Sequence, residues 1–263
     1  MNSHTQNISI FCALITRDLK VIRQRLHNLI IDGLILVCVA VLVFGYFLPL
    51  LGMPTTLIAP IFLGNSLSFF LASLGYNFAT RMAYDLKFGH FIEYFLTLPL
   101  PKRWLFAYFI TSFIIETTII TIPLITLGII LLGNNFGPIQ GSFITFLMVY
   151  FLVLLFWALF FLGSSFTYNY QWFKNNIWAR RIMPLFIFSP AFFTFKKVIT
   201  IIPTLAQLML LNPLTYIVEG LRVALLGSGD YLPLTTCLMG ILIGIMFMYV
   251  RLYYGFYKQL DPA

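Results

Sequence analysis

Long apolar runs constrain this chain more than any other feature of its sequence. A helix needs roughly 20 apolar residues to cross a bilayer. Five runs reach that length, and a sixth, Ile182–Phe195, does so only when extended by its neighbours. The five are Leu29–Leu51, Leu57–Ala79, Leu105–Leu132, Phe143–Ser165 and Leu232–Tyr254. With 60% hydrophobic and 9% charged residues, the chain lacks the polar surface of a water-soluble globule. Because lipid offers no partner to exposed backbone groups, we expect an all-α membrane protein with six transmembrane helices.

The basic residues indicate how these helices are oriented. Most of the 16 Lys and Arg residues lie before the first run, between the second and third, after the fourth, or after the last. Lys196, Lys197 and Arg222 lie on the other side. Cytoplasmic loops carry an excess of Lys and Arg, so we expect a multi-pass protein of the plasma (inner) membrane with both termini in the cytoplasm. The net charge of +8 then reflects topology, and no nucleic-acid partner is indicated.

The segment before the first run has the spacing of an amphipathic helix. Its apolar residues recur every three or four positions: Ile8, Phe11, Ile15, Leu19, Ile22 and Leu26. The basic residues Arg17, Lys20 and Arg23 belong to the same segment. We expect residues 1–28 to form a helix in the inner membrane surface, with its basic side toward lipid headgroups and cytosol. A soluble helix packed on the bundle is the alternative.

The charged stretch between the second and third runs must bend. Pro99 and Pro101 lie just ahead of Lys102 and break any continuous helix there. We therefore expect a cytoplasm-facing elbow, which is a natural docking surface for another protein.

The stretch before the last run departs from a simple span. Asn212 is a good helix N-cap, Pro213 suits the first helical position, and Gly227 is a plausible stop. These signals predict a helix over Pro213–Leu226, which is too short to cross a bilayer. We expect residues 196–227 to form an outer helical hairpin, interfacial or re-entrant, ahead of the last span.

Several kinds of chemistry are not indicated. No Lys is followed by Ser or Thr and no Gly–Lys pair occurs, so the chain cannot form a phosphate-cradling P-loop. The three histidines include no pair four residues apart, and Cys12, Cys38 and Cys237 have no paired spacing. We therefore expect no metal, no cofactor and no catalytic residues on this chain. Any nucleotide hydrolysis must take place on another polypeptide.

Polar residues inside the apolar runs are candidates for a substrate path. Glu116 falls near the middle of the third run, where a charge must face the bundle or a watery path. It either contacts substrate or protons, or is a neutralised packing residue. Asn65 and Trp157 are further candidates, with helix packing as the alternative for each. Glu219 and Arg222 can pair across one turn of their short helix.

Three segments together resemble the membrane subunit of an ABC exporter of the ABC-2 type. They are Ile8–Asn28, Gly89–Pro99 and Asn212–Arg222, and the last is the most specific. The resemblance covers essentially the whole chain as one domain of residues 1–263, with spans one to five in 29–195 and the last span and cytoplasmic tail in 228–263. Two features depart from the family. Leu98 separates Thr97 from Pro99, where the family more usually has Thr directly followed by Pro, and Pro184 and Pro190 interrupt the fifth span.

The resemblance also implies partners and residue roles. It implies a second copy of this permease and two copies of an ABC ATPase subunit, which hold the ATP and Mg. The inner segment is similar to the family's coupling helix, and its expected contact residues are Glu93, Tyr94, Thr97, Leu98, Pro99, Pro101 and Lys102. The outer segments resemble a hairpin that lids the exit, with Asn212, Pro213, Tyr216, Glu219 and Arg222.

The expected function is that of a transport subunit without enzyme activity of its own. It would export an amphiphilic substrate, such as a lipid-linked saccharide, a lipid or a hydrophobic drug, because the outer loops are short and the interior is apolar and aromatic. An ion-coupled secondary transporter that uses Glu116 is the alternative.

Overall fold

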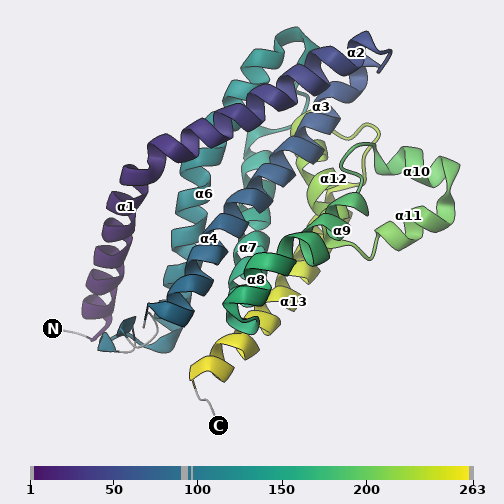
Figure 1. Cartoon of the computed structure of the whole chain (residues 1–263). Coiled ribbons are helices and arrows are strands. Elements are labelled where there is room, and N and C mark those ends of the chain that lie inside the picture. The colour runs from purple at the N-terminus through teal and green to yellow at the C-terminus, as the bar shows by residue number, and fades with distance from the viewer. Residues whose placement is uncertain (1–2, 90–93, 96, 261–263) are drawn as a thin grey trace.

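The chain folds into a bundle of helices, seen here in a computed structural model that describes residues 3–89, 94–95 and 97–260 (Figure 1). No strand occurs in these ranges, which confirms the all-α fold. Five helical stretches are long and apolar enough to cross a membrane: Thr5–Leu50, Thr55–Phe88, Lys102–Phe136, Phe143–Thr167 and Leu234–Phe256. They coincide with the five long apolar runs and are typical of a multi-pass membrane protein.

The amphipathic segment and the first span form one helix. Helix α1 (Ser3–Ala40) continues through the π-helix η1 (Val41–Phe47) into α2 (Leu48–Leu50). We expected the amphipathic helix to end near residue 28, but the helix continues through this position into the first span. No proline interrupts the chain before Pro49, in the last turn. Figure 1 shows a bend along α1 instead, and α1 packs along α6 (Lys102–Leu132).

The middle of the bundle is built around α7 (Phe143–Thr167). This helix packs against α4 (Ser68–Phe88), α6 and α13 (Leu234–Leu260). Two short pieces lead into α4: α3 (Ile58–Ile61) and the π-helix η3 (Phe62–Leu67). Because α7 is enclosed on several sides, most of its residues are buried, as its apolar composition on all faces predicts.

The sixth apolar run does not form the expected span over Ile182–Phe195. Helix α8 (Tyr170–Ile177), η5 (Trp178–Ile182) and α9 (Met183–Ile187) follow one another, and the helical stretch ends at Phe188. Pro190 has no N–H for the next helical bond to the Phe186 carbonyl, which instead accepts from the Ser189 N–H and hydroxyl. The expectation of six spans stays a prediction.

The predicted helix over Pro213–Leu226 is confirmed as α12. The Asn212 side chain accepts from the Leu214 N–H at 3.0 Å, and Gly227 ends the helix with a φ of 91°. The preceding short helices are α10 (Phe195–Ile201) and α11 (Pro203–Met209), and α11 and α12 are bent by 95°. Helix α12 is enclosed by α7, α13 and η3. The interfacial or re-entrant placement of the hairpin stays a prediction.

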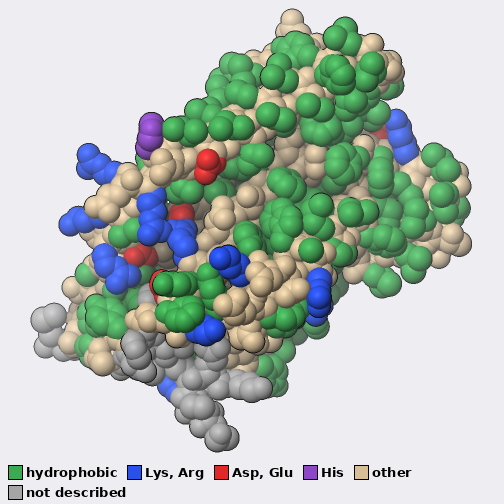
Figure 2. All heavy atoms as spheres, viewed as in Figure 1, with side chains coloured by type: hydrophobic (Ala, Val, Ile, Leu, Met, Phe, Trp, Pro, Cys, Tyr) green, Lys and Arg blue, Asp and Glu red, His purple; other side chains and the backbone are tan. Residues whose placement is uncertain are grey.

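Charge is unevenly distributed along the bundle. Helix α1 begins and α13 ends at the same end, which we call the charged end because Lys and Arg gather there in Figure 2. On the visible face, the opposite half is covered mainly by hydrophobic side chains (Figure 2). This separation gives the molecule one polar end and one apolar body.

Candidate functional site

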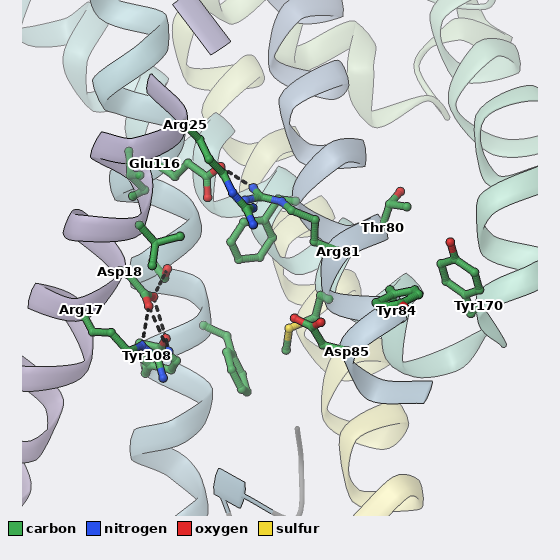
Figure 3. Close-up of a pocket in the computed structure, with 16 residues that line it drawn as sticks. Arg17, Asp18, Arg25, Thr80, Arg81, Tyr84, Asp85, Tyr108, Glu116 and Tyr170 are labelled. Carbon is green, nitrogen blue, oxygen red and sulfur yellow. Dashed lines mark hydrogen bonds and ion pairs between the residues drawn. The ribbon is translucent and has the colours of Figure 1, made fainter. Parts of the chain in front are cut away.

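A polar cavity of about 670 Å³ lies between α1, α4 and α6 at the charged end (Figure 3). Six charged side chains line it: Arg17, Asp18, Arg25, Arg81, Asp85 and Glu116. Helix α1 contributes the first three, and α4 and α6 contribute the others. A hollow with this many charges, beside helices able to cross a membrane, is the strongest candidate for a functional site.

One wall of the cavity is a hydrogen-bonded cluster on α1 and α6. Tyr108 and Ser112 each donate to one Asp18 carboxylate oxygen at 2.6 Å. Arg17 donates to the other Asp18 oxygen at 3.0 Å and to the Tyr108 hydroxyl at 2.8 Å. The Arg17 side chain is 45% exposed, and its guanidinium also takes part in the cavity wall through Asp18 and Tyr108. Its expected contact with lipid headgroups stays a prediction.

The other two basic residues expected on the surface of α1 are Lys20 and Arg23. Both are exposed, as their side of the amphipathic pattern predicts. Asp18 was missed in the sequence, although a signal existed. It lies three residues after Ile15 and four before Ile22, so it shares the apolar face with them, and an acid there has to find partners in the bundle.

Glu116 forms an ion pair with Arg81 across the cavity. Glu116 is 8% exposed, while the Arg81 side chain is 37% exposed. The sequence predicted that Glu116 faces the bundle or a watery path, and both descriptions fit its place in the cavity wall. Arg81 was missed, since nothing in the sequence pairs it with a residue on another helix.

The expected elbow is exposed on one side and anchored on the other. Tyr94, Thr97, Pro99, Pro101 and Lys102 are exposed, and Leu98 is half-buried. Glu93 lies outside the described residues. Between them, Phe95 is 2% exposed and contacts the rings of Tyr108 and Phe109 at centroid distances of 5.5 Å.

Phe95 also joins the elbow to α1. The Arg17 guanidinium lies over the Phe95 ring, 5.7 Å from its centroid. Phe95 therefore contacts both Tyr108 and Arg17, two of the three residues that bind the Asp18 carboxylate in the cavity wall. Phe95 is thus a point of contact between the elbow and this wall.

A second cavity, of about 360 Å³, is mostly apolar and contains Asn65 of η3. Its walls come from α1, η1, η3, α4, α6 and α9. Trp157, the other candidate for a substrate path, lines neither this cavity nor the polar one. Its side chain is fully buried in α7, stacked on Phe161 and Phe186. The packing alternative therefore holds for Trp157.

Arg222 and Glu219 form a buried ion pair at 2.9 Å, as their spacing predicts. Both side chains are 0% exposed. Arg222 also donates to the carbonyls of Pro60 (2.8 Å), Ala191 (2.9 Å) and Phe193 (2.8 Å). These contacts connect α12 to α3 and to the loop before α10, so the pair is an internal junction.

Glu219 extends the same junction to the first residue of α10 and to the connection before α13. Its carboxylate accepts from the Phe195 N–H at 3.3 Å and from the Leu232 N–H at 3.0 Å. Two other polar residues of the motif bond backbone carbonyls, Asn212 at a distance along the chain and Tyr216 nearby. Asn212 donates to the Leu185 and Phe188 carbonyls at 2.7 and 2.8 Å, and Tyr216 donates to the Leu210 carbonyl at 2.8 Å.

The residues expected to lid an exit are therefore mostly enclosed. Asn212, Glu219 and Arg222 are buried, while Pro213 and Tyr216 are half-buried. They hold α9, α10, α11 and α12 together, which is a structural role that a lid could share.

A third, polar cavity of about 520 Å³ lies at the end opposite the charged end. Asp230 and Tyr231, in the connection to α13, line it. The Lys196 ammonium donates to the Asp230 carboxylate at 2.9 Å, and this hydrogen bond holds the pKa of Asp230 below its ordinary value. Burial raises the pKa of the Tyr231 hydroxyl. Within the described ranges, no group of three or more His, Cys, Asp and Glu could hold a metal ion.

Neither known protein families nor curated proteins provide a match to this chain. Its function therefore has to be inferred from its own residues and their geometry.

Proposed function

We propose that this chain is the permease subunit of an ATP-driven exporter of the ABC-2 type, powered by a separate ATPase. The observation that carries the proposal is the elbow after α4, which is exposed on its outer side and anchored through Phe95 to the cavity wall. An exposed bend that is mechanically tied to two helices is what a motor subunit needs to push against. Because the chain has no P-loop, the motor must be a partner.

In this mechanism, two ATPase subunits dock on Tyr94, Thr97 and Pro99 of two permease copies. ATP-driven closure moves the elbow, and Phe95 moves Tyr108 on α6 against Arg17 on α1. Relative movement of α1 and α6 changes the apolar cavity as well, because both helices also line it. The charged end faces the cytoplasm, consistent with its Lys and Arg content.

The substrate is an amphiphile, such as a lipid, a lipid-linked saccharide or a hydrophobic drug. The mostly apolar cavity around Asn65 suits a hydrophobic tail, and the polar cavity suits a charged or polar head. The two cavities share α1, α4 and α6 as walls. An amphiphile could therefore move along one set of helices.

An ion-coupled secondary transporter based on Glu116 is the second candidate. A proton-carrying acid has to exchange protons during the cycle, and Glu116 is instead held by the Arg81 guanidinium. This pairing favours a structural role for Glu116.

Replacing Phe95 with Ala should uncouple the permease from its ATPase. Spin labels at Lys20→Cys on α1 and Lys87→Cys on α4, with Cys12 and Cys38 changed to Ser, would report the width of the cavity. We expect ATP plus vanadate to change the label distance in the complex, and Phe95→Ala to reduce the shifted population about tenfold, equivalent to ~1.4 kcal/mol of lost aromatic contact.

The matched control is Tyr254→Ala, which removes a ring that is 69% exposed on α13. It should leave the distance change intact. ATP hydrolysis should continue in the Phe95→Ala complex, because its outer docking surface is unchanged. A full distance change in that variant would contradict the proposed coupling route.

A further inference from the structure

Two of the six charges in the polar cavity have no side-chain partner. Arg17 pairs with Asp18 and Arg81 pairs with Glu116. Among the described residues, neither the Arg25 guanidinium nor the Asp85 carboxylate makes a hydrogen bond or ion pair. The cavity therefore offers one guanidinium and one carboxylate that no direct hydrogen bond or ion pair occupies within the described residues.

These two groups face the same space from different helices. Arg25 extends from α1 into the cavity toward Arg81, and Asp85 lies on α4 one turn beyond Arg81 (Figure 3). The Asp85 carboxylate interacts electrostatically with the positive charges of both Arg81 and Arg25.

We propose that this cavity binds the zwitterionic headgroup of an aminophospholipid, with its phosphate at Arg25 and its ammonium at Asp85. An anion alone would leave Asp85 unpaired, and a cation alone would leave Arg25 unpaired. A phosphodiester joined to a primary amine satisfies both, since a guanidinium binds phosphate and a carboxylate binds ammonium.

The size and surroundings of the cavity favour a lipid over a free phosphoamine. Its volume of about 670 Å³ accommodates a headgroup. Val21 of α1 lies at the cavity and is 39% exposed, and farther along the same helix Ile31, Ile35 and Val39, spaced four residues apart, expose apolar side chains on one side. Acyl chains can follow this side of α1 while the headgroup occupies the charged space. The inference does not require the proposed export function, because a resident lipid needs the same contacts as a transported one.

The test is native mass spectrometry of the full chain in detergent, with an equimolar mixture of phosphatidylethanolamine and phosphatidylglycerol that carry the same acyl chains. We expect the wild type to prefer phosphatidylethanolamine about tenfold, as one charge-assisted contact would provide. Arg25→Gln should lose both lipids, because both carry the phosphate. Asp85→Asn should lose only the preference, because phosphatidylglycerol has no ammonium.

Matched controls separate the site from general surface charge. Arg23→Gln removes a neighbouring, exposed charge from the same helix, and Asp230→Asn removes an acid from the opposite end, so both should keep the wild-type preference. Unchanged lipid binding in Arg25→Gln, or an unchanged preference in Asp85→Asn, overturns the proposal. Displacement of the lipid by equimolar glycerophosphoethanolamine, which has the same headgroup without acyl chains, would contradict the claim that the ligand is a lipid. All of these measurements use the chain alone, so they remain valid if no ATPase partner exists.

Discussion

Arg222→Ala is expected to destabilise the protein by about 3–5 kcal/mol, the usual cost of leaving one member of a buried ion pair without its partner. Glu219 would lose its counter-charge, and the carbonyls of Pro60, Ala191 and Phe193 would lose their donor. The measurement is the free energy of unfolding of the detergent-solubilised chain, obtained by titration with SDS. Arg23→Ala, an exposed control on α1, should change it by less than about 0.5 kcal/mol.

Two further variants separate this junction from a general effect of charge. Arg222→Lys keeps the charge but cannot donate to three carbonyls in a planar fork, so it should recover little of the lost stability. Gly64→Ala should act on the same junction, because a Cβ there would overlap the Arg222 guanidinium and lie 2.9 Å from the Ala191 carbonyl oxygen. The double variant Gly64→Ala/Arg222→Ala should cost less than the sum of the two single losses, because the overlap with the guanidinium is gone while the close approach to the Ala191 carbonyl remains. Additive losses would contradict this account of the junction.

Arg81→Ala is expected to cost on the order of 2 kcal/mol of stability, because it leaves the Glu116 carboxylate without its counter-charge. The value is lower than for Arg222, since the Arg81 side chain is 37% exposed and the cavity admits water. The second change Glu116→Ala should restore most of the loss. The same SDS titration measures both variants.

Glu116→Gln tests the role of the acid in function. If Glu116 only pairs with Arg81, Gln can replace it, because its amide oxygen still accepts a hydrogen bond from Arg81. The ATP-induced change in label distance should then persist. If Glu116 carried protons during transport, Glu116→Gln would abolish the change in label distance. Loss of that distance change in Glu116→Gln, with normal stability and normal ATP hydrolysis, would favour the secondary-transport alternative.

Local sequence signals predicted the elements that depend on local chemistry. The cap at Asn212, the first-turn Pro213 and the stop at Gly227 fixed the bounds of α12, and the Glu219–Arg222 pair followed from spacing along one helix. The long apolar runs likewise predicted five helices able to cross a membrane. In each case the physical cause lies within a few residues of its effect.

Contacts between distant segments could not be predicted in the same way. Arg222 binds backbone carbonyls of Pro60, Ala191 and Phe193, and a carbonyl acceptor leaves no trace in side-chain identity. The polar cavity depends on α1 turning Asp18 toward Tyr108 of α6, which lies 90 residues farther along the chain. The enclosure of α12 by α7, α13 and η3 was likewise not predictable, because its length alone indicated only an interfacial or re-entrant helix.

The source of energy is the central claim, and it is tested most directly by the Lys20→Cys/Lys87→Cys label pair in inside-out membrane vesicles that contain the native partners. We predict that ATP plus vanadate changes the label distance, that a protonophore does not prevent this change, and that the chain reconstituted alone shows no response to ATP. A distance change driven by a proton gradient in the chain reconstituted alone, without ATP, would contradict the account.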